Sequence, residues 1–213
     1  MGHYFSEQQE TRSAEREISI GVVDPPLTLR TDRGVFSYGR LDSGSELLLR
    51  RAPTPPAAGT FLDLGCGAGP IALTLARRVP DAHVVAVDVN ARARALCAAN
   101  AERNGVTNVV VAAPDDVDAA QRFELIWSNP PIRIGKAALH QLLTTWLRRL
   151  GPAGTAVLVV QRNLGADSLQ HWLIDNGWPT DRMASSKGYR LLRVAATVQP
   201  ASDAGRVDDD AHP

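Results

Sequence analysis

Short apolar runs alternate with longer amphipathic stretches along most of the chain. The runs are almost continuously apolar, as strands buried on both faces are. They cover residues 60–65, 83–89, 108–113, 123–129 and 155–161. Between them, apolar residues recur at helical spacing over residues 70–79, 91–104, 136–150 and 166–176. This alternation predicts an α/β fold with a doubly wound, mostly parallel sheet and helices on both faces.

The two ends of the chain follow a different pattern. Residues 16–22 and 27–31 are typical of two short strands, and residues 34–51 are typical of a turn that leads into a helix. Residues 180–198 predict an antiparallel hairpin that turns at Lys187. The hairpin adds two strands to the five parallel ones, so we expect a seven-stranded sheet.

Composition and charge divide the chain into three parts. We expect residues 1–59 to form an N-terminal extension that packs on a core of residues 60–198, followed by a disordered acidic tail over residues 199–213. The 23 basic and 23 acidic residues balance overall. The tail holds four Asp and one Arg, a net charge of −3, so residues 1–198 carry +3. This mildly basic body is compatible with an RNA partner but does not identify one.

Cysteine and histidine usage excludes several classes of protein. Cys66 and Cys97 are too few for a disulfide framework or a structural zinc site, and no histidine cluster completes a metal set. The amino end has no apolar signal segment, and no run approaches the length of a membrane span. We expect a cytoplasmic monomer or weak dimer with no metal and no membrane contact.

Three alternate glycines, Gly65, Gly67 and Gly69, stand in "FLDLGCGAGP" where the first buried strand meets its helix. Glycine permits positive φ and lets backbone N–H groups approach a ligand closely. Nineteen residues after Gly69, Asp88 closes the next strand, where a carboxylate can accept both hydroxyls of a ribose. A plain tight turn is the alternative, but the pattern favours a nucleoside cofactor.

The spacing of these glycines helps to identify the cofactor. It fits a dinucleotide poorly, because Pro70 stands where that fingerprint needs a small residue. With Asp63 the glycines instead give D-x-G-x-G-x-G, which resembles motif I of class I S-adenosylmethionine-dependent methyltransferases. The resemblance implies a Rossmann-like fold that binds S-adenosyl-L-methionine (SAM). It also implies that Asp63 and the glycine-loop backbone hold the methionine part of SAM.

The same resemblance implies further cofactor residues. Asp88 would hold the ribose, with Asn90 beside it in "VDVNARA". An acid after the third strand would meet the adenine amine. Asp115 and Asp116 both qualify in "AAPDDVD", and we favour Asp115, although either could be a solvated turn residue.

The fourth strand ends in "SNPPI", where two prolines give up two backbone donors in a row. A turn explains one proline but not both. Pro131 biases Pro130 toward an extended conformation, so the Pro130 carbonyl can point into the site as a bare acceptor beside the Asn129 side-chain oxygen. Two acceptors suit an NH₂ group, and holding its hydrogens would aim the nitrogen lone pair at a methyl donor.

This stretch matches the N-P-P-[aromatic] motif of amino-group methyltransferases, which implies catalytic roles for Asn129, Pro130 and Pro131. Those enzymes usually place an aromatic residue fourth to stack on a planar target, whereas this chain has Ile132. Ile132 can cover one face of the target by apolar contact. Phe36 could supply the aromatic stack, or it could belong to the core.

Taken together, the motifs resemble one family more closely. They are "HYF" (3–5), "GVFSYGRLDSGSELLL", "DLGCGAGPIAL", "VDVNARA", "SNPPIRIGK" and "KGYRLLR". They are similar to the small-subunit ribosomal RNA guanine-N2 methyltransferases and their compact, single-domain relatives. This resemblance implies an RNA partner and guanine N2 as the methyl acceptor. It also places Phe36, Ser37, Leu41 and Asp42 near the site.

Basic residues offer a partial check on the RNA interpretation. Arg133 and Lys136 stand at or near the start of the helix predicted over residues 136–150, where a cation opposes the helix dipole and so hints at a phosphate or acidic partner. A solvated rim is the alternative. Lys187, Tyr189 and Arg190 form a second candidate RNA rim.

Two other functions fit the same motifs. One is methyl transfer to another amine, such as a protein glutamine, a DNA base or a small molecule. The other is a SAM-binding module without catalysis, which the intact Asn129-Pro130-Pro131 stretch argues against.

Overall fold

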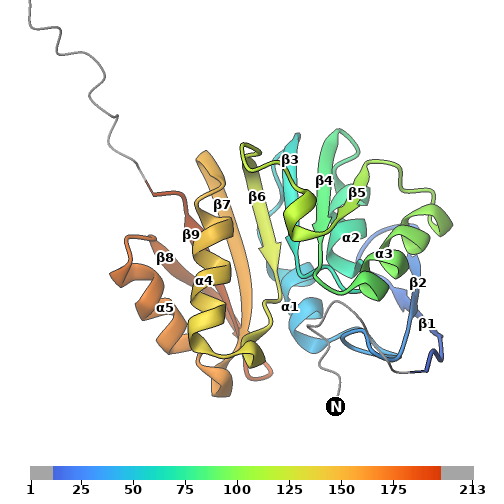
Figure 1. Cartoon of the computed structure of the whole chain (residues 1–213), viewed down its shortest axis with the longest axis horizontal. Helices are drawn as coiled ribbons and strands as arrows, with labels where there is room; N and C mark the ends of the chain where they lie inside the picture. Colours follow the sequence, from blue (N-terminus) through green and yellow to red (C-terminus); the bar gives the residue numbers. More distant parts are fainter. Residues whose placement is uncertain (1–11, 198–213) are drawn as a thin grey trace, which may run out of the picture.

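The computed structural model describes residues 12–197, in which the apolar runs form one mixed sheet (Figure 1). Its strand order is β5-β4-β3-β6-β7-β9-β8; the first five of these are parallel, and β9 runs antiparallel to its two neighbours, β7 and β8. The strands are β3 (Gly59–Leu64), β4 (Ala82–Val87), β5 (Val109–Ala112), β6 (Phe123–Ser128), β7 (Leu150–Gln161), β8 (Thr180–Ser186) and β9 (Tyr189–Ala195). The predicted doubly wound, seven-stranded sheet with its C-terminal hairpin is confirmed.

Five α-helices and three short 3₁₀ helices accompany the sheet within the described residues. The α-helices are α1 (Ser43–Arg51), α2 (Pro70–Arg78), α3 (Ala91–Arg103), α4 (Lys136–Leu147) and α5 (Ala166–Asp175). The 3₁₀ helices are η1 (Pro114–Asp116), η2 (Ile132–Ile134) and η3 (Arg162–Leu164). A separate two-stranded sheet, β1 (Arg16–Ile20) with β2 (Leu27–Thr31), matches the predicted N-terminal strands.

The sheet separates two apolar layers. Successive strand residues point to opposite faces, so Phe61 joins the cluster that holds the apolar residues of α1, α2 and α3, whereas Leu62 joins that of α4 and α5. Leu27 and Leu48 belong to the Phe61 cluster. The N-terminal segment therefore packs into the same core as the sheet. The predicted tail over residues 199–213 lies outside the described residues.

One predicted helix boundary is wrong. The helix predicted over residues 136–150 ends at Leu147, and Leu150 opens strand β7, paired with Phe123. Leu150 fits the apolar spacing of the helix, but Gly151 and Pro152 follow it, and both disfavour helix. A Cβ at Gly154 would lie 2.6 Å from the Phe123 carbonyl oxygen. The close packing of β7 against β6 therefore places Leu150 in a strand rather than in the helix.

Two asparagines, Asn100 in α3 and Asn104 at its C-cap, bind the edge of β2 in place of another strand. The Asn100 side chain accepts from Arg30 N at 2.8 Å and donates to the Arg30 carbonyl at 2.9 Å. Asn104, one turn later, pairs in the same way with Thr28 N and O, both at 2.9 Å. Asn100 also donates to the Ala68 carbonyl at 2.8 Å. The N-terminal hairpin, beside α3 in Figure 1, is thereby joined to the glycine loop.

Replacing Asn100 with alanine is expected to lower the free energy of unfolding by roughly 3 kcal/mol, because the change leaves the buried Ala68 carbonyl and the part-buried backbone groups of Arg30 without their partners. Asn100 is only 1% exposed, and its bond to the Ala68 carbonyl is buried, so water does not readily replace that bond. Urea denaturation measures the loss. Asn163→Ala, at an exposed position, is the control and should change the value by less than about 0.5 kcal/mol. Equal effects of the two variants would contradict the anchoring role.

Candidate active site

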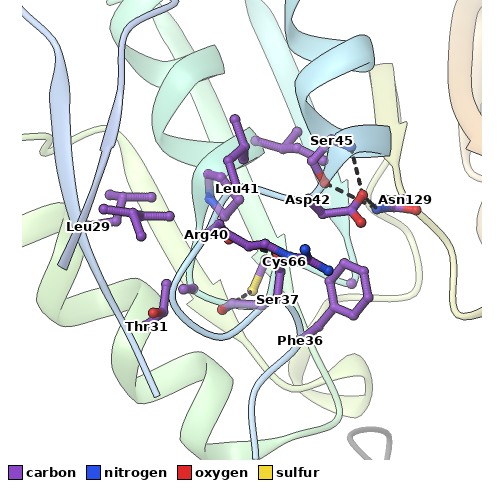
Figure 2. A pocket seen from close by; sticks show the side chains of 16 residues that line it. Leu29, Thr31, Phe36, Ser37, Arg40, Leu41, Asp42, Ser45, Cys66 and Asn129 are labelled. Carbon is purple, nitrogen blue, oxygen red and sulfur yellow. Dashed lines mark hydrogen bonds between the residues drawn. The ribbon is translucent and has the colours of Figure 1, made fainter. Parts of the chain in front are cut away.

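The carboxyl ends of β3 and β6 lie side by side at the point where the strand order reverses. In doubly wound sheets this switch point opens a crevice that binds ligands. Here the crevice is a cavity between the glycine loop after β3, Asn129 after β6 and the N-terminal segment (Figure 2). Its lining includes Phe36, Ser37, Leu41, Asp42, Ser45, Gly65, Gly67 and Asn129.

Glycine is required at the three loop positions for two different structural reasons. All have positive φ, at 82° for Gly65, 54° for Gly67 and 91° for Gly69, a region that other residues enter only at a cost. A Cβ at Gly69 would lie 2.7 Å from the Cys97 sulfur, so this glycine lets α3 approach the loop. A Cβ at Gly65 or Gly67 would meet no protein atom within 4 Å. The first two glycines therefore leave a cradle open toward the cavity.

Asp63 is fully buried under this loop. Its Oδ2 accepts from Ala72 N at 2.9 Å, within the first turn of α2, which has a glycine at its N-cap and no side-chain cap. Asp63 therefore caps α2 from the neighbouring strand. Its Oδ1 has no hydrogen-bond partner among the described residues. Burial, opposed by the Ala72 bond and assisted by the charge of Asp88, raises the pKa of Asp63 to about 8.

This raised pKa predicts a pH-dependent stability. The carboxyl has a pKa of about 8 when folded and 3.8 as its ordinary value. Between these pH values the folded state holds a proton that the unfolded state releases, so the contribution to stability is complete below about pH 4 and is lost as pH rises to about 8. In the wild type this group should lower the free energy of unfolding by up to about 1.4 kcal/mol for each pH unit in that range. Asp63→Asn, which does not titrate, is expected to abolish that pH dependence. Urea denaturation of both proteins at pH 5, 6.5 and 8 tests this, and a constant difference would contradict it.

Asp88 and Asn90 connect the loop to α3. The Asp88 carboxylate accepts from Gly67 N and from Asn90 N, both at 2.9 Å. Burial raises the pKa of Asp88, although these bonds and the charge of Arg94 oppose the shift. Asn90 is buried, accepts the first N–H groups of α3 as its N-cap, and donates to the Gly34 carbonyl at 2.9 Å. Both side chains thus shape the rim of the cradle, and their roles toward a cofactor stay predictions.

Asp115 and Asp116 belong to η1, just after β5, and both are exposed. Neither lines the cavity described above. The geometry does not separate the two candidates, and the preference for Asp115 as the adenine contact stays a prediction.

The two prolines after Asn129 make a tight turn. Pro131 has φ −75° and ψ 74°, the values of an inverse γ-turn. Ile132 N accordingly donates to the Pro130 carbonyl oxygen at 2.8 Å. The prediction that this carbonyl is a bare acceptor is therefore wrong, because the turn uses one of its two lone pairs. The other lone pair remains for a substrate.

The side chain of Asn129 lies against α1. Its Nδ2 donates to Asp42 Oδ2 at 2.8 Å and to Ser45 Oγ at 3.1 Å, as Figure 2 shows. Asp42 was placed near the site by the family resemblance, whereas Ser45 was not predicted. The only signal for Ser45 in the sequence is its position three residues after Asp42, at the start of a helix.

The structure separates the two candidates for covering a planar substrate. Phe36 is 44% exposed and lines the cavity, and Figure 2 shows its ring near Asp42 and Asn129. Phe36 is therefore not a core residue. Ile132 packs instead against the apolar cluster of α4 and α5. Ser37, with φ 64°, holds the turn after Phe36 by donating to the Arg40 carbonyl at 2.8 Å.

The side chains of the two predicted basic rims differ in their exposure and in their contacts with the rest of the protein. Arg133 and Lys136 are exposed beside the start of α4, which has no side-chain cap. Lys187 is exposed at the tip of the β8–β9 hairpin. Arg190 forms an ion pair with Asp167. The Tyr189 ring, by contrast, lies at the start of α1, where it would be 2.8 Å from a Cβ at Gly44.

Within residues 12–197, no group of three or more His, Cys, Asp or Glu side chains could hold a metal ion. Over the same described range, no helix has both the length and the apolar character needed to cross a membrane.

A doubly wound sheet with a glycine loop after β3 and an Asn-Pro-Pro turn after β6 is the arrangement expected of a class I methyltransferase. The methyltransferase small domain family matches residues 26–193. The chain belongs to this family, and the resemblance noted in the sequence is confirmed.

Two curated relatives match most of the chain. The uncharacterized protein YbxB of Bacillus subtilis is 37% identical over 195 residues, which are 90% of this chain and 97% of YbxB. Ribosomal RNA small subunit methyltransferase C of Pseudomonas entomophila is 33% identical over 193 residues, 88% of this chain and 57% of that protein.

A solved structure shows the same fold. The 16S rRNA N2 G1207 methyltransferase (RsmC) of T. thermophilus, in complex with AdoMet and guanosine, matches with a TM-score of 0.68 at 25% identity. The match covers 86% of this chain and 51% of the other. The chain thus spans about half the length of the ribosomal RNA methyltransferases that it matches, at 57% and 51%.

Proposed function

We propose that the protein is a SAM-dependent methyltransferase that methylates the exocyclic N2 of guanine in ribosomal RNA. The observation that carries the proposal is that Asn129 and the open glycine loop line one cavity. A cofactor held on the loop and an amine held by Asn129 would therefore meet. The similarity to methyltransferases named for the small-subunit ribosomal RNA, one of them solved with guanosine, supports the choice of acceptor.

The glycine loop of the cavity and the two acidic residues beside the loop fit SAM. Gly65 and Gly67 leave room for a ligand against the loop backbone, and Asp88 stands at the end of β4, where a carboxylate can accept ribose hydroxyls. Asp63 would act on the methionine part indirectly, by fixing the loop and the start of α2. When bound, SAM supplies an electrophilic methyl group on its sulfonium.

The chain's own contribution is to bind and aim the amine. Asn129 Oδ1 and the remaining Pro130 lone pair can accept the two N–H hydrogens of guanine N2, which turns the nitrogen lone pair away from the ring and toward the methyl group. The Phe36 ring, exposed into the cavity, can stack on the base. No strong base is needed to aim the amine, because hydrogen bonding and position raise its reactivity.

RNA would reach the site past the exposed Arg133 and Lys136. Guanine N2 inside an A-form helix lies in the shallow groove, so we expect the target base to be unpaired or extruded. A duplex locked against opening should therefore be methylated more slowly than a single-stranded loop. Equal rates would contradict extrusion.

The proposal is tested with purified protein, tritiated SAM and separate pools of ribosomal RNA, transfer RNA and small-subunit particles from cells that lack the gene. Nucleoside analysis after the reaction should find the label in N2-methylguanosine from ribosomal RNA or from the particles. Label in a different nucleoside would replace the acceptor in the proposal. Measured SAM binding without transfer to any RNA would overturn the RNA assignment in favour of a protein or small-molecule amine.

A further inference from the structure

We propose that Asp42, assisted by Ser45, is a positioning residue that holds the Asn129 amide with its oxygen toward the substrate amine. This inference rests on the proposed function and adds to it the residue that orients the Asn129 oxygen, the acceptor for the substrate amine. Among the described residues, the Asn129 side chain makes its hydrogen bonds through Nδ2, to Asp42 Oδ2 at 2.8 Å and Ser45 Oγ at 3.1 Å.

The orientation of this amide decides whether the site can work. The two ends of an asparagine amide have nearly the same shape, but the oxygen accepts hydrogen bonds and the nitrogen only donates them. A substrate NH₂ group needs an acceptor. If the Asn129 amide turned over, its oxygen would face the Asp42 carboxylate, two acceptors would meet, and the NH₂ end would face the substrate. Asp42 therefore opposes the unproductive orientation.

Asp42 is itself held firmly. The same Oδ2 atom accepts from Gly44 N at 2.8 Å and Ser45 N at 3.0 Å, as the N-cap of α1. The positive end of a helix dipole stabilises a carboxylate at this position. Gly44 allows the arrangement, because a Cβ there would lie 2.9 Å from Asp42 Oδ2 and 2.8 Å from the Tyr189 ring. The start of α1 thus fixes a carboxylate that in turn fixes Asn129 (Figure 2).

The decisive variant is Asp42→Ser. Serine is also a good N-cap, so α1 keeps its cap, but the shorter side chain does not reach Asn129. We expect kcat for methyl transfer to fall about 10- to 100-fold, the usual effect of a misplaced catalytic group, while the Kd for SAM and the urea midpoint stay unchanged. Ser45→Ala should cause a smaller loss. Ser43→Ala, in the same helical turn, is the matched control and should leave kcat unchanged.

Two further variants separate positioning from other roles. Asp42→Asn keeps an acceptor oxygen at the same reach and should retain most of the activity, whereas a role that needs the negative charge would be lost equally in Asp42→Asn and Asp42→Ser. In the Asn129→Ala background, Asp42→Ser should cost nothing more, because its target is gone. Losses that multiply in the double variant would overturn the inference.

A nuclear magnetic resonance experiment separates failure of this inference from failure of the proposed function. If the wild-type protein binds SAM but methylates no RNA, the proposed function fails. The exchange rate of the Asn129 side-chain NH₂ protons still shows whether Asp42 and Ser45 hold the amide. They should exchange slowly with water in the wild type and in Ser43→Ala, and faster in Asp42→Ser. Equal exchange in all three proteins would overturn the positioning role, whatever the substrate.

Discussion

Replacing Asn129 with alanine is expected to lower the rate of methyl transfer by about 10²- to 10³-fold, the usual effect of losing one preorganised hydrogen bond at the reacting group. The side chain borders the cavity and is half-buried, and its removal leaves only the Pro130 carbonyl, already engaged by Ile132 N. The amine would then bind without a fixed direction for its lone pair. Single-turnover rates at saturating SAM and RNA measure this effect directly.

SAM affinity is the internal control for Asn129→Ala. The cofactor cradle is built from other residues, so calorimetry should give a Kd for SAM close to that of the wild type. Asn163→Ala, exposed on η3, should match the wild type in rate as well as in Kd. A transfer rate of Asn129→Ala within about threefold of the wild type would show that the amine is held elsewhere, since that change is worth less than about 1 kcal/mol.

A single methyl group at Gly67 is expected to weaken SAM binding by about 10- to 100-fold. The Cβ of Gly67→Ala would project into the cavity, where it meets no protein atom within 4 Å, so it occupies ligand space. An added methyl in a close-packed contact costs about 1–3 kcal/mol, which gives this change in Kd. The backbone strain at φ 54° should also lower the free energy of unfolding by about 1 kcal/mol.

Gly105 offers a matched control for that experiment. It has a similar positive φ of 62° and follows α3, and a Cβ added there would likewise meet no atom within 4 Å. Gly105→Ala should therefore lose about the same 1 kcal/mol of stability and bind SAM normally. If both variants bound SAM equally well, the glycine loop would not be the cofactor cradle.

Local patterns predicted the strands and the glycine loop because the features that produce them are adjacent in sequence. The apolar runs are continuous, and Gly65 and Gly67 adopt a positive φ that glycine reaches without steric cost. The same local reasoning failed where pairing with a neighbouring strand determines the secondary structure. Leu150 fitted the spacing of a helix, yet it pairs with Phe123 in the sheet.

The candidate site shows the same limit. Asn129 and its prolines were predictable from one short motif, but the γ-turn that engages the Pro130 carbonyl depends on the backbone angles of Pro131. Ser45 lies 84 residues before Asn129, and no spacing rule connects residues so far apart. Only the packing of α1 against β7 and β9 of the sheet brings them together.

The hairpin anchored by Asn100 bears on how this protein could be divided or fused. Because Asn100 binds both Arg30 and the Ala68 carbonyl, cutting the chain just before β3 would remove more than a peripheral appendage. The truncated fragment would lose the support of its cofactor loop and, with α1, the carboxylate that orients Asn129. An engineered fragment intended to keep activity should therefore retain β1, β2 and α1, and a foreign domain is better attached ahead of β1 than inserted between α1 and β3.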